Sequence, residues 1–333
     1  MSTRHESELL ARKVRSLIID DDKKEDEFYN KGHPWSIVKL LLLGQWADIY
    51  STIIKTYFTT YRFVDLLAGA GRTQIEETQG KLVKGSVFVV DTFAQKFPFD
   101  NYVLIERDTD KFNALKERTS LFGDRCEVLC EDTNSVVTQI FANYASHNLV
   151  FIDNEGFNVN WKSIEAILNA KADIIINYPT AQFERVAQKS PSKLTEFFGD
   201  ESWRETTFAR EYSVNIYMEN LKNAYERIKN KNSPYPINAY VENIRLGNKS
   251  YFYDMILVTK QGDYTNVWGS WKKQWHGKNP DCMLSFVEGK SLCLDVFDSF
   301  SHGVSEVQKK YLKSKKQPKP NHNAKLESFF GSS

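Results

Sequence analysis

Cysteine and histidine are scarce in this chain of 333 residues, which holds 4 of the first and 6 of the second. No two cysteines form a CxxC pair, so neither a disulfide framework nor a cysteine-based zinc site is expected. We interpret the cysteines as reduced packing residues, and the histidines show no metal-ligand spacing. These residues are Cys126, Cys130, Cys282 and Cys293, with His33, His147, His276 and His302 among the scattered histidines. The sequence therefore predicts no bound metal.

An excess of charge of one sign is also missing, because 44 basic residues face 43 acidic ones and the net charge is +1. No protein-wide basic field draws the chain to nucleic acid, so any such contact must come from local patches. Residues 1–31 are charged and lack the apolar core of a signal peptide. The run Leu40–Leu43 is far too short to cross a bilayer. We expect a cytoplasmic protein with no membrane partner.

The chain instead carries an alternation of short apolar strands and helices, which follows a stretch of helical apolar spacing over His33–Tyr57. The strands are continuous runs rich in Val and Ile, as expected when helices cover both faces of a parallel sheet. The predicted strands are Tyr61–Leu67, Tyr102–Glu106, Glu127–Cys130, Leu149–Asp153 and Ala172–Asn177, with a polar loop over Arg72–Lys84 and helices in the other intervals. This pattern predicts a doubly wound sheet with right-handed crossovers.

Two longer runs, Ile237–Leu246 and Tyr251–Thr259, follow a helical, polar stretch. The turn residues Gly247 and Asn248 between them predict an antiparallel hairpin. A mostly parallel sheet that ends in an antiparallel hairpin is typical of class I methyltransferases, so we predict that Rossmann-like α/β fold with helices on both faces. The expected organisation is a charged N-terminal segment at 1–32, the α/β domain at 33–260, a C-terminal extension at 261–303 and a disordered basic tail at 304–333.

A glycine-rich turn ends the first predicted strand, in the sequence Asp65-Leu66-Leu67-Ala68-Gly69-Ala70-Gly71. Open α/β sheets bind ligands at the carboxyl ends of their strands. Glycines there let the backbone approach a ligand closely and present N–H groups to it. We therefore predict cofactor contacts from Asp65, Ala68, Gly69 and Gly71.

Acidic residues end the following strands. Glu106 ends the second strand, where a carboxylate can accept both hydroxyls of a ribose, and Asp132 follows the third, where it can accept from an adenine amino group. Asp153 ends the fourth strand, the usual place for catalytic groups in this fold, and Asn154 follows it. Acids at these positions also cap helices, and that alternative stays open. Asn177-Tyr178-Pro179-Thr180 is similar to the Asn-Pro-Pro-Tyr of amino-methylating enzymes, but it follows the fifth strand and lacks the second proline.

Several of these segments together resemble the three-Cys-motif partner proteins (TcmP). The resemblance covers roughly residues 33 to 260 and rests on Trp35–Lys39, Phe63–Arg72, Lys84–Ser86, Phe151–Phe157, Trp161, Asn177–Pro179 and Arg185. It implies a methyltransferase-like protein that binds S-adenosylmethionine and pairs with a cysteine-bearing partner. Two departures concern its site: Val87 stands where the family usually has proline, and Asp153-Asn154-Glu155-Gly156 replaces a pattern that resembles Asp-Pro-Phe-Gly. Asp153 and Asn154, which stand at the second departure, are the residues that we predict to be catalytic.

The C-terminal sequence Asn323-Ala324-Lys325-Leu326-Glu327-Ser328-Phe329-Phe330 resembles the peptide that binds PCNA-type sliding clamps, with Asn323 in place of the usual Gln. One helical turn would put Leu326, Phe329 and Phe330 on one side as a plug for an apolar pocket. The resemblance implies an archaeal or eukaryotic host, with a nucleoid-associated location if the host is archaeal. The alternative is a tail that folds back onto the domain.

The segment Trp268–Trp275 interleaves aromatic residues with lysines. It could stack on bases, but three tryptophans at helical spacing more simply pack on the sheet.

Two functions remain open from the sequence. The first is a methyltransferase that uses S-adenosylmethionine, with nucleic acid as a candidate substrate, and acts in DNA repair, replication or defence while tethered to the clamp. The second is an inactive adaptor that links a cysteine-motif partner to the clamp. A nuclease is disfavoured because the clustered metal-binding acids that it needs are missing.

Overall fold

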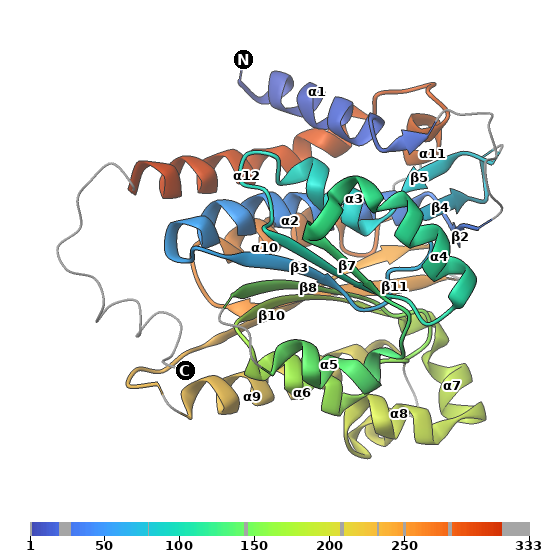
Figure 1. Ribbon diagram of the computed structural model, residues 1–333, viewed down its shortest axis with the longest axis vertical. Helices are drawn as coiled ribbons and strands as arrows, with labels where there is room; N and C mark the ends of the chain where they lie inside the picture. Colours follow the sequence, from blue (N-terminus) through green and yellow to red (C-terminus); the bar gives the residue numbers. More distant parts are fainter. Residues whose placement is uncertain are drawn as a thin grey trace.

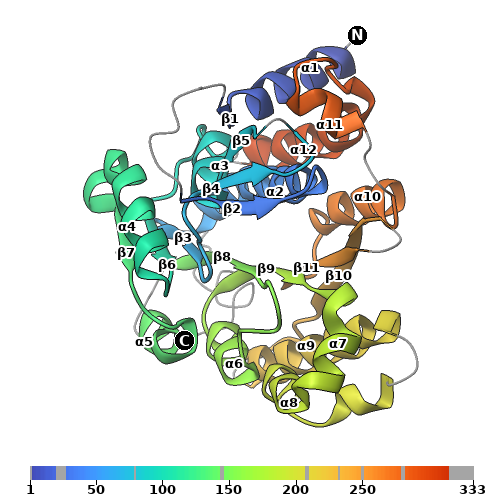
Figure 2. The same cartoon turned by 90° about the vertical axis from the view of Figure 1, so that its right-hand side faces the viewer.

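The computed structural model describes residues 2–19, 28–78, 80–142, 146–206, 210–231, 233–248, 251–278 and 282–314. Its centre is a seven-stranded sheet with the order β10-β11-β9-β8-β3-β6-β7 (Figures 1 and 2). The strands are β3 (Tyr61–Asp65), β6 (Asn101–Ile105), β7 (Cys126–Leu129), β8 (His147–Asp153), β9 (Ala172–Tyr178), β10 (Ala239–Gly247) and β11 (Phe252–Lys260).

Neighbouring strands from β7 to β9 pair in parallel, whereas β11 pairs antiparallel with both β9 and β10. In the hairpin, Val241 lies opposite Val258. The chain starts in the middle of the sheet at β3, runs outward to β7, and returns to β8 on the other side of β3. This strand order, with its terminal antiparallel hairpin, is the predicted Rossmann-like class I methyltransferase fold.

Helices cover both faces of the sheet (Figures 1 and 2). Alternate residues of each strand point to opposite sides: in β8, Leu149 and Phe151 join one hydrophobic core, while Val150 and Ile152 join the other. The first core lies under α2 (Trp35–Tyr57), α3 (Ser86–Phe93), α10 (Thr265–Trp275), α11 (Cys282–Val287) and α12 (Leu294–Ser314), and the second under α5 (Thr133–Phe141), α6 (Trp161–Asn169), α8 (Pro191–Phe198) and α9 (Arg210–Asn230). Helix α4 (Thr109–Arg118) adds Leu115 to the first core, and α7 (Phe183–Lys189) adds Phe183 to the second.

Helix α2 is long and apolar enough to cross a membrane by length and composition, with a mean hydropathy of 1.3 over its most apolar window. Within the protein, 89% of that window is buried. Its apolar residues are therefore accounted for by packing against the sheet and the outer helices.

Both ends of the described chain are more ordered than the sequence suggested. Residues 304–314, predicted to be part of a disordered tail, continue helix α12. The physical reason is that buried Phe297, Phe300, Val304 and Val307 recur at helical spacing across the predicted boundary. The N-terminal segment, for which we predicted charge but no helix, forms helix α1 (Ser2–Arg15), which packs against α12.

A second, four-stranded sheet replaces the polar loop predicted over Arg72–Lys84, and that prediction is wrong. Its order is β1-β5-β4-β2, with β1 (Ile18–Ile19), β5 (Leu82–Lys84), β4 (Arg72–Ile75) and β2 (Asn30–Gly32). Alternation is hard to detect in strands of two to four residues. Ile75 and Val83 are nonetheless buried, and they anchor this sheet to the first core.

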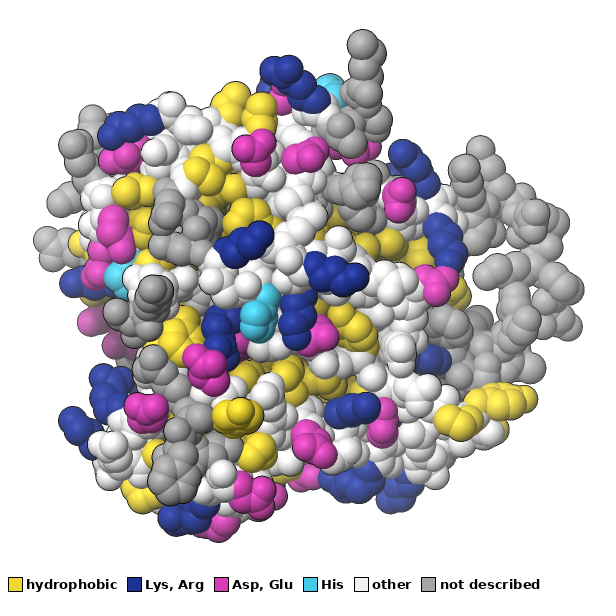
Figure 3. Space-filling view, turned by 180° about the vertical axis from the view of Figure 1, so that it is seen from behind, with side chains coloured by type: hydrophobic (Ala, Val, Ile, Leu, Met, Phe, Trp, Pro, Cys, Tyr) yellow, Lys and Arg dark blue, Asp and Glu magenta, His cyan; other side chains and the backbone are white. Residues whose placement is uncertain are grey.

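The tryptophans of α10 pack in the core rather than form a stacking surface. Trp268 and Trp271 are fully buried, and Trp268 Nε1 donates to the Glu242 carbonyl oxygen at 3.1 Å. On the face shown in Figure 3, basic and acidic side chains are interspersed, in keeping with the small net charge.

Candidate functional site

The glycine turn lies at the carboxyl edge of the sheet, between β3 and β8, where the strand order reverses. Ligands of open α/β sheets bind at such a switch point. Gly69 and Gly71 have φ values of 61° and 73°, a left-handed backbone that favours glycine. A Cβ atom on Gly69 would clash with the side-chain Nδ2 of Asn30, so the turn and strand β2 approach closely. Ala68, by contrast, uses its N–H inside the fold, where it donates to the Ile105 carbonyl at 2.9 Å.

Asp65 holds this turn in place through hydrogen bonds. Its side chain is buried, and its carboxylate accepts hydrogen bonds from the Leu67 backbone N–H at 3.1 Å and from the Ser86 hydroxyl. Burial raises the pKa of Asp65 to about 7, and the hydrogen bonds from Ser86 and Leu67 oppose that rise. Because both carboxylate oxygens are already used, Asp65 is placed to hold the turn rather than to grip a ligand.

A cavity of about 200 Å³, here called the acidic cavity, opens beside the turn. Its lining includes Gly69, Asn30 and Asn158 together with a set of charged residues. Six of these are acidic and two are basic: Glu106, Asp108, Glu131, Asp132, Asp153 and Glu155 against Arg107 and Lys111. The surplus of carboxylates favours a ligand that carries positive charge.

Glu106 and Asp132 both line the acidic cavity, and the structure also confirms part of the capping alternative. Asp132 caps helix α5 by accepting from the Asn134 N–H at 2.9 Å, and its other oxygen lies 3.7 Å from Arg107 Nη1. Glu106 accepts from the Asp108 N–H at 2.8 Å. The neighbouring Asp108 caps helix α4. Asp132 therefore caps a helix and lines the cavity at once.

Asp153 lies between the acidic cavity and a second cavity of about 160 Å³, and lines both. The second is here called the aromatic cavity, and its lining includes His33, Trp35, Tyr251 and Tyr253. One carboxylate oxygen of Asp153 accepts from Lys39 Nζ at 2.6 Å and the other from Asn177 Nδ2 at 2.7 Å. Lys39 comes from helix α2 and Asn177 from strand β9, so two elements fix the orientation of Asp153.

Asn154 belongs to the loop that follows β8. Its side chain is 1% exposed, and its Oδ1 accepts from the Asn158 N–H at 2.8 Å. Phe157 in this loop has φ of 59°, which is unusual for a residue other than glycine. Its ring is buried against Phe197, with ring centroids 4.9 Å apart, and this packing holds the loop in place.

The structure thus brings the predicted Gly69, Glu106, Asp132 and Asp153 together around one cavity. Asp65 and Ala68 line the narrow gap beside it, and the predicted Gly71 turns away toward Leu115. Asn30, Lys39 and Lys111 were missed. Each lies on an element whose approach to the site depends on tertiary packing, and only the Trp35–Lys39 segment of the family resemblance gave a signal for one of them. The predicted clamp-binding residues Asn323, Leu326, Phe329 and Phe330 lie outside the described residues.

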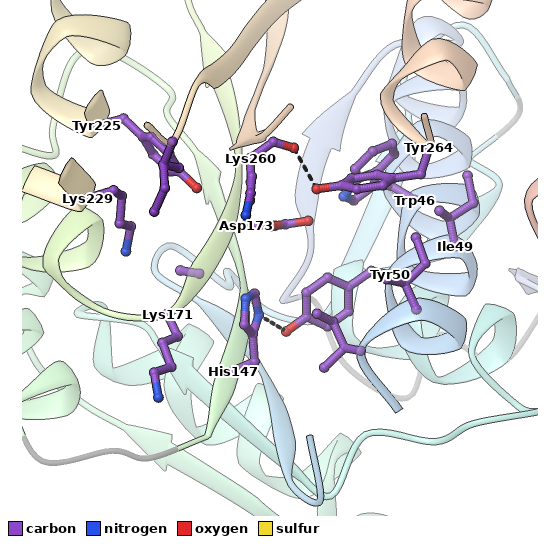
Figure 4. Close-up of a pocket in the computed structure, with 14 residues that line it drawn as sticks. Trp46, Ile49, Tyr50, His147, Lys171, Asp173, Tyr225, Lys229, Lys260 and Tyr264 are labelled. Carbon is purple, nitrogen blue, oxygen red and sulfur yellow. Dashed lines mark hydrogen bonds between the residues drawn. The ribbon is translucent and has the colours of Figure 1, made fainter. Parts of the chain in front are cut away.

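A further cavity lies at the opposite, amino edge of the sheet (Figure 4). Burial raises the pKa of Asp173 to about 7, lowers that of Lys229 to about 8 and lowers that of His147 to about 3. Asp173 accepts from the Thr259 hydroxyl at 2.7 Å, and His147 Nδ1 lies 2.8 Å from the Tyr50 hydroxyl. Its volume of about 40 Å³ leaves room for little more than water. We interpret it as a polar cluster of the interior.

Comparison of the chain with protein-family models and with curated proteins found no match. Among solved structures, it is similar to Trm1 from Pyrococcus horikoshii in complex with S-adenosyl-L-methionine, with 11% identity and a TM-score of 0.40 over 71% of this chain and 58% of Trm1. The chain thus spans less than two thirds of the length of Trm1. It is also similar to the protein LPL1258 from Legionella pneumophila (12% identity, TM-score 0.41, 67% and 88% of the two chains). A third similar structure is an rRNA methylase from Streptococcus thermophilus (9% identity, TM-score 0.34, 65% and 95%).

Proposed function

We propose that the acidic cavity binds S-adenosylmethionine and that the protein is a methyltransferase that acts on nucleic acid. The observation that carries the proposal is the balance of six acidic and two basic side chains around a glycine turn at the switch point of the sheet. S-adenosylmethionine carries a sulfonium, an ammonium and a carboxylate group, and its net positive charge is attracted by such a cavity. The same carboxylates repel the pyrophosphate of a dinucleotide.

Five of the predicted residues take specific parts in this proposal. Glu106 accepts hydrogen bonds from the ribose hydroxyls, and Asp132 accepts one from the adenine amino group. The backbone at Gly69 approaches the ligand closely. Asp65 positions the turn through its hydrogen bond to Leu67. When bound, S-adenosylmethionine supplies an activated methyl group, and Asp153 faces the acceptor from the neighbouring cavity. Methyl transfer depends mainly on alignment, so few polar residues suffice.

Calorimetric titration with S-adenosylmethionine tests the proposal. We expect Glu106→Gln to weaken binding by roughly 10- to 100-fold, because a hydrogen bond to a charged group contributes about 1.5–3 kcal/mol. The matched control is Glu127→Gln, which makes the same change on the exposed carboxylate of strand β7, outside the cavity. If both variants bind as tightly as the native protein, the assignment of Glu106 is wrong.

The second candidate is an adaptor without turnover, favoured by the replacement of the family pattern at Asn154-Glu155 and by the structural use of Asn154. A folded protein that binds no S-adenosylmethionine in the same titration would support the adaptor and reject the enzyme. The resemblance to three-Cys-motif partner proteins supports, in either case, a complex with a cysteine-bearing partner. Co-expression and co-purification with such a protein test it.

We also propose that the C-terminal peptide tethers the protein to a PCNA-type clamp, and so to DNA repair, replication or defence. The support is the spacing of Leu326, Phe329 and Phe330 in the sequence. A clamp pull-down should recover the native chain and lose the double variant Phe329→Ala/Phe330→Ala. Equal recovery of both would reject the tether.

A further inference from the structure

The aromatic cavity has a volume of about 160 Å³, similar to the 200 Å³ of the acidic cavity. It is built from the segment before α2, the loop after β8, the end of β9 and the start of β11. It meets the acidic cavity at Asp153 and Glu155, which line both. A ligand in one cavity would therefore lie beside a ligand in the other.

One wall of this cavity is a cluster of three rings. The His33 and Trp35 rings lie 4.4 Å apart at an interplanar angle of 31°, and the Tyr251 ring lies 6.2 Å from Trp35 at 30°. Trp35 is buried, whereas Tyr251 is 41% exposed. The three rings are tilted against one another, with 57° between His33 and Tyr251, and Tyr251 is the most exposed of the cluster's large rings. Such a wall suits a flat, aromatic ligand.

Two amide side chains that line the cavity, those of Asn154 and Asn177, have unused hydrogen-bonding atoms. Asn177 Oδ1 and Asn154 Nδ2 are buried and have no hydrogen-bond partner among the described residues, although the other amide atom of each side chain is bonded. One is an acceptor and the other a donor. Buried polar atoms of this kind are costly unless a ligand or water satisfies them. The acceptor, Asn177 Oδ1, belongs to the side chain whose Nδ2 donates to Asp153. Two kinds of acceptor, the Asn177 oxygen and the Asp153 carboxylate, therefore lie near the junction with the acidic cavity.

From these three features we infer that the aromatic cavity receives, as the methyl acceptor, a nucleobase whose exocyclic amine stands beside an accepting ring nitrogen on the Watson–Crick edge, that is, adenine or cytosine; this inference rests on the proposed function. The base stacks on Tyr251, its amine donates toward Asn177 Oδ1 and Asp153, and its neighbouring ring nitrogen accepts from Asn154 Nδ2. In the transfer, the amine nitrogen forms a bond to the methyl carbon as the bond from carbon to sulfur breaks. The sulfonium becomes the neutral thioether of S-adenosylhomocysteine, and one amine proton leaves to the Asp153 carboxylate. A keto base such as thymine offers no amine to these acceptors.

Charge around the cavity indicates that the base, and not the phosphate, is recognised. The basic groups at its margin are already paired with acids: Lys31 Nζ lies 3.8 Å from Glu76, His33 Nδ1 lies 2.6 Å from Glu77, and Lys39 bonds Asp153. A base inside a strand must leave the stack to enter such a pocket. Single strands are therefore the expected form of a polymeric ligand, with a free nucleoside as the other source of the same chemistry.

Fluorescence anisotropy with short single-stranded oligonucleotides tests the inference. Each oligonucleotide carries one central base, adenine, cytosine or thymine, among abasic positions, and the protein is saturated with S-adenosylhomocysteine. We expect adenine or cytosine to bind at least tenfold more tightly than thymine or an entirely abasic strand. Tyr251→Ala should remove this preference, Tyr251→Phe should keep it, and Tyr235→Ala, a change of another exposed tyrosine away from the cavity, should leave it intact.

Titration with free adenosine and cytidine separates the two sources. Binding of the nucleosides as tightly as the strands would support the pocket and identify a small-molecule acceptor. Equal binding of all strands, or a preference that survives Tyr251→Ala, would overturn the inference. Because Tyr251 lies outside the acidic cavity, Tyr251→Ala should bind S-adenosylmethionine normally. Loss of the base preference with intact cofactor binding therefore bears on this inference alone, and absent cofactor binding bears on the proposed function.

Discussion

The buried carboxyl group of Asp65 should make the stability of the fold depend on pH, and Asp65→Asn should remove that dependence. Burial raises the pKa of Asp65 from its ordinary value of 3.8 to about 7. Between these two values the folded protein holds a proton that the unfolded chain has released. Asp65 therefore stabilises the fold fully below about pH 3.8, and this contribution is lost as the pH rises through 7.

The magnitude follows from the linkage between proton binding and folding. From pH 5 to the folded pKa near 7 the loss covers about two pH units at about 1.4 kcal/mol each, or roughly 2.7 kcal/mol in total. Asn cannot ionise, and it can keep the hydrogen bond from the Leu67 N–H through its own oxygen. The free energy of unfolding of Asp65→Asn relative to the native protein should therefore rise by about 2–3 kcal/mol between pH 5 and pH 8.

Urea unfolding of both proteins at the two pH values measures this difference, and all other titrating groups cancel because both chains contain them. Ser86→Ala is the companion variant: it removes a hydroxyl that stabilises the ionised form, so it should enlarge the pH dependence. An equal stability difference at pH 5 and pH 8 for Asp65→Asn would show that the carboxyl group is ionised in the fold throughout. The turn would then be held by a charge that the surroundings stabilise.

Three further predictions concern the supports of the site and the interior. Asp173→Asn should also gain stability relative to the native protein as pH rises from 5 to 7, because burial raises the pKa of Asp173 to about 7; a flat difference in urea unfolding would mean that Lys229 keeps it ionised. Phe157→Ala should cost about 3 kcal/mol of unfolding free energy, since the ring is 2% exposed, and a loss below about 1 kcal/mol would show that the loop repacks. Lys39→Met should lower the free energy of unfolding by about 1–3 kcal/mol, because one Asp153 oxygen loses the hydrogen bond from the Lys39 amine. An unchanged free energy of unfolding in urea would show that this ion pair does not stabilise the fold.

The fold was largely predictable because its central strands carry strong signals. Runs such as Leu149–Asp153 and Ala172–Asn177 are buried on both faces, and the hairpin turn at Gly247 and Asn248 marks the antiparallel end. The small sheet was not predictable in the same way. Its strands have two to four residues each, and Arg72–Ile75 is held by pairing with the distant segment Asn30–Gly32. Such pairing leaves no local pattern in the sequence.

The same distinction, between local sequence signals and long-range packing, separates the site residues that were predicted from those that were missed. Glu106, Asp132 and Asp153 follow strands, so chain order alone places them at one edge of the sheet. Lys39 lies on the inner face of an apolar helix, where its ion pair with Asp153 spans 114 positions of sequence. Asn30 reaches Gly69 only because the small sheet folds over the turn. Residues that come to the site through tertiary packing were therefore missed, and residues that strand ends deliver were found.

Net charge illustrates why composition could not foresee the character of the cavity. The whole chain has a charge of +1, which by itself gave no reason to expect attraction for either sign of ligand. Around the acidic cavity, however, carboxylates outnumber basic groups by six to two, because strands β6, β7 and β8 each deliver an acid to the same edge. Electrostatic attraction depends on local charge, since ions screen distant surface charges within about 8–10 Å. A ligand that enters the cavity is therefore influenced by the nearby carboxylates and not by the net charge of the whole chain. For this reason the cavity favours a cationic nucleoside over a polyphosphate.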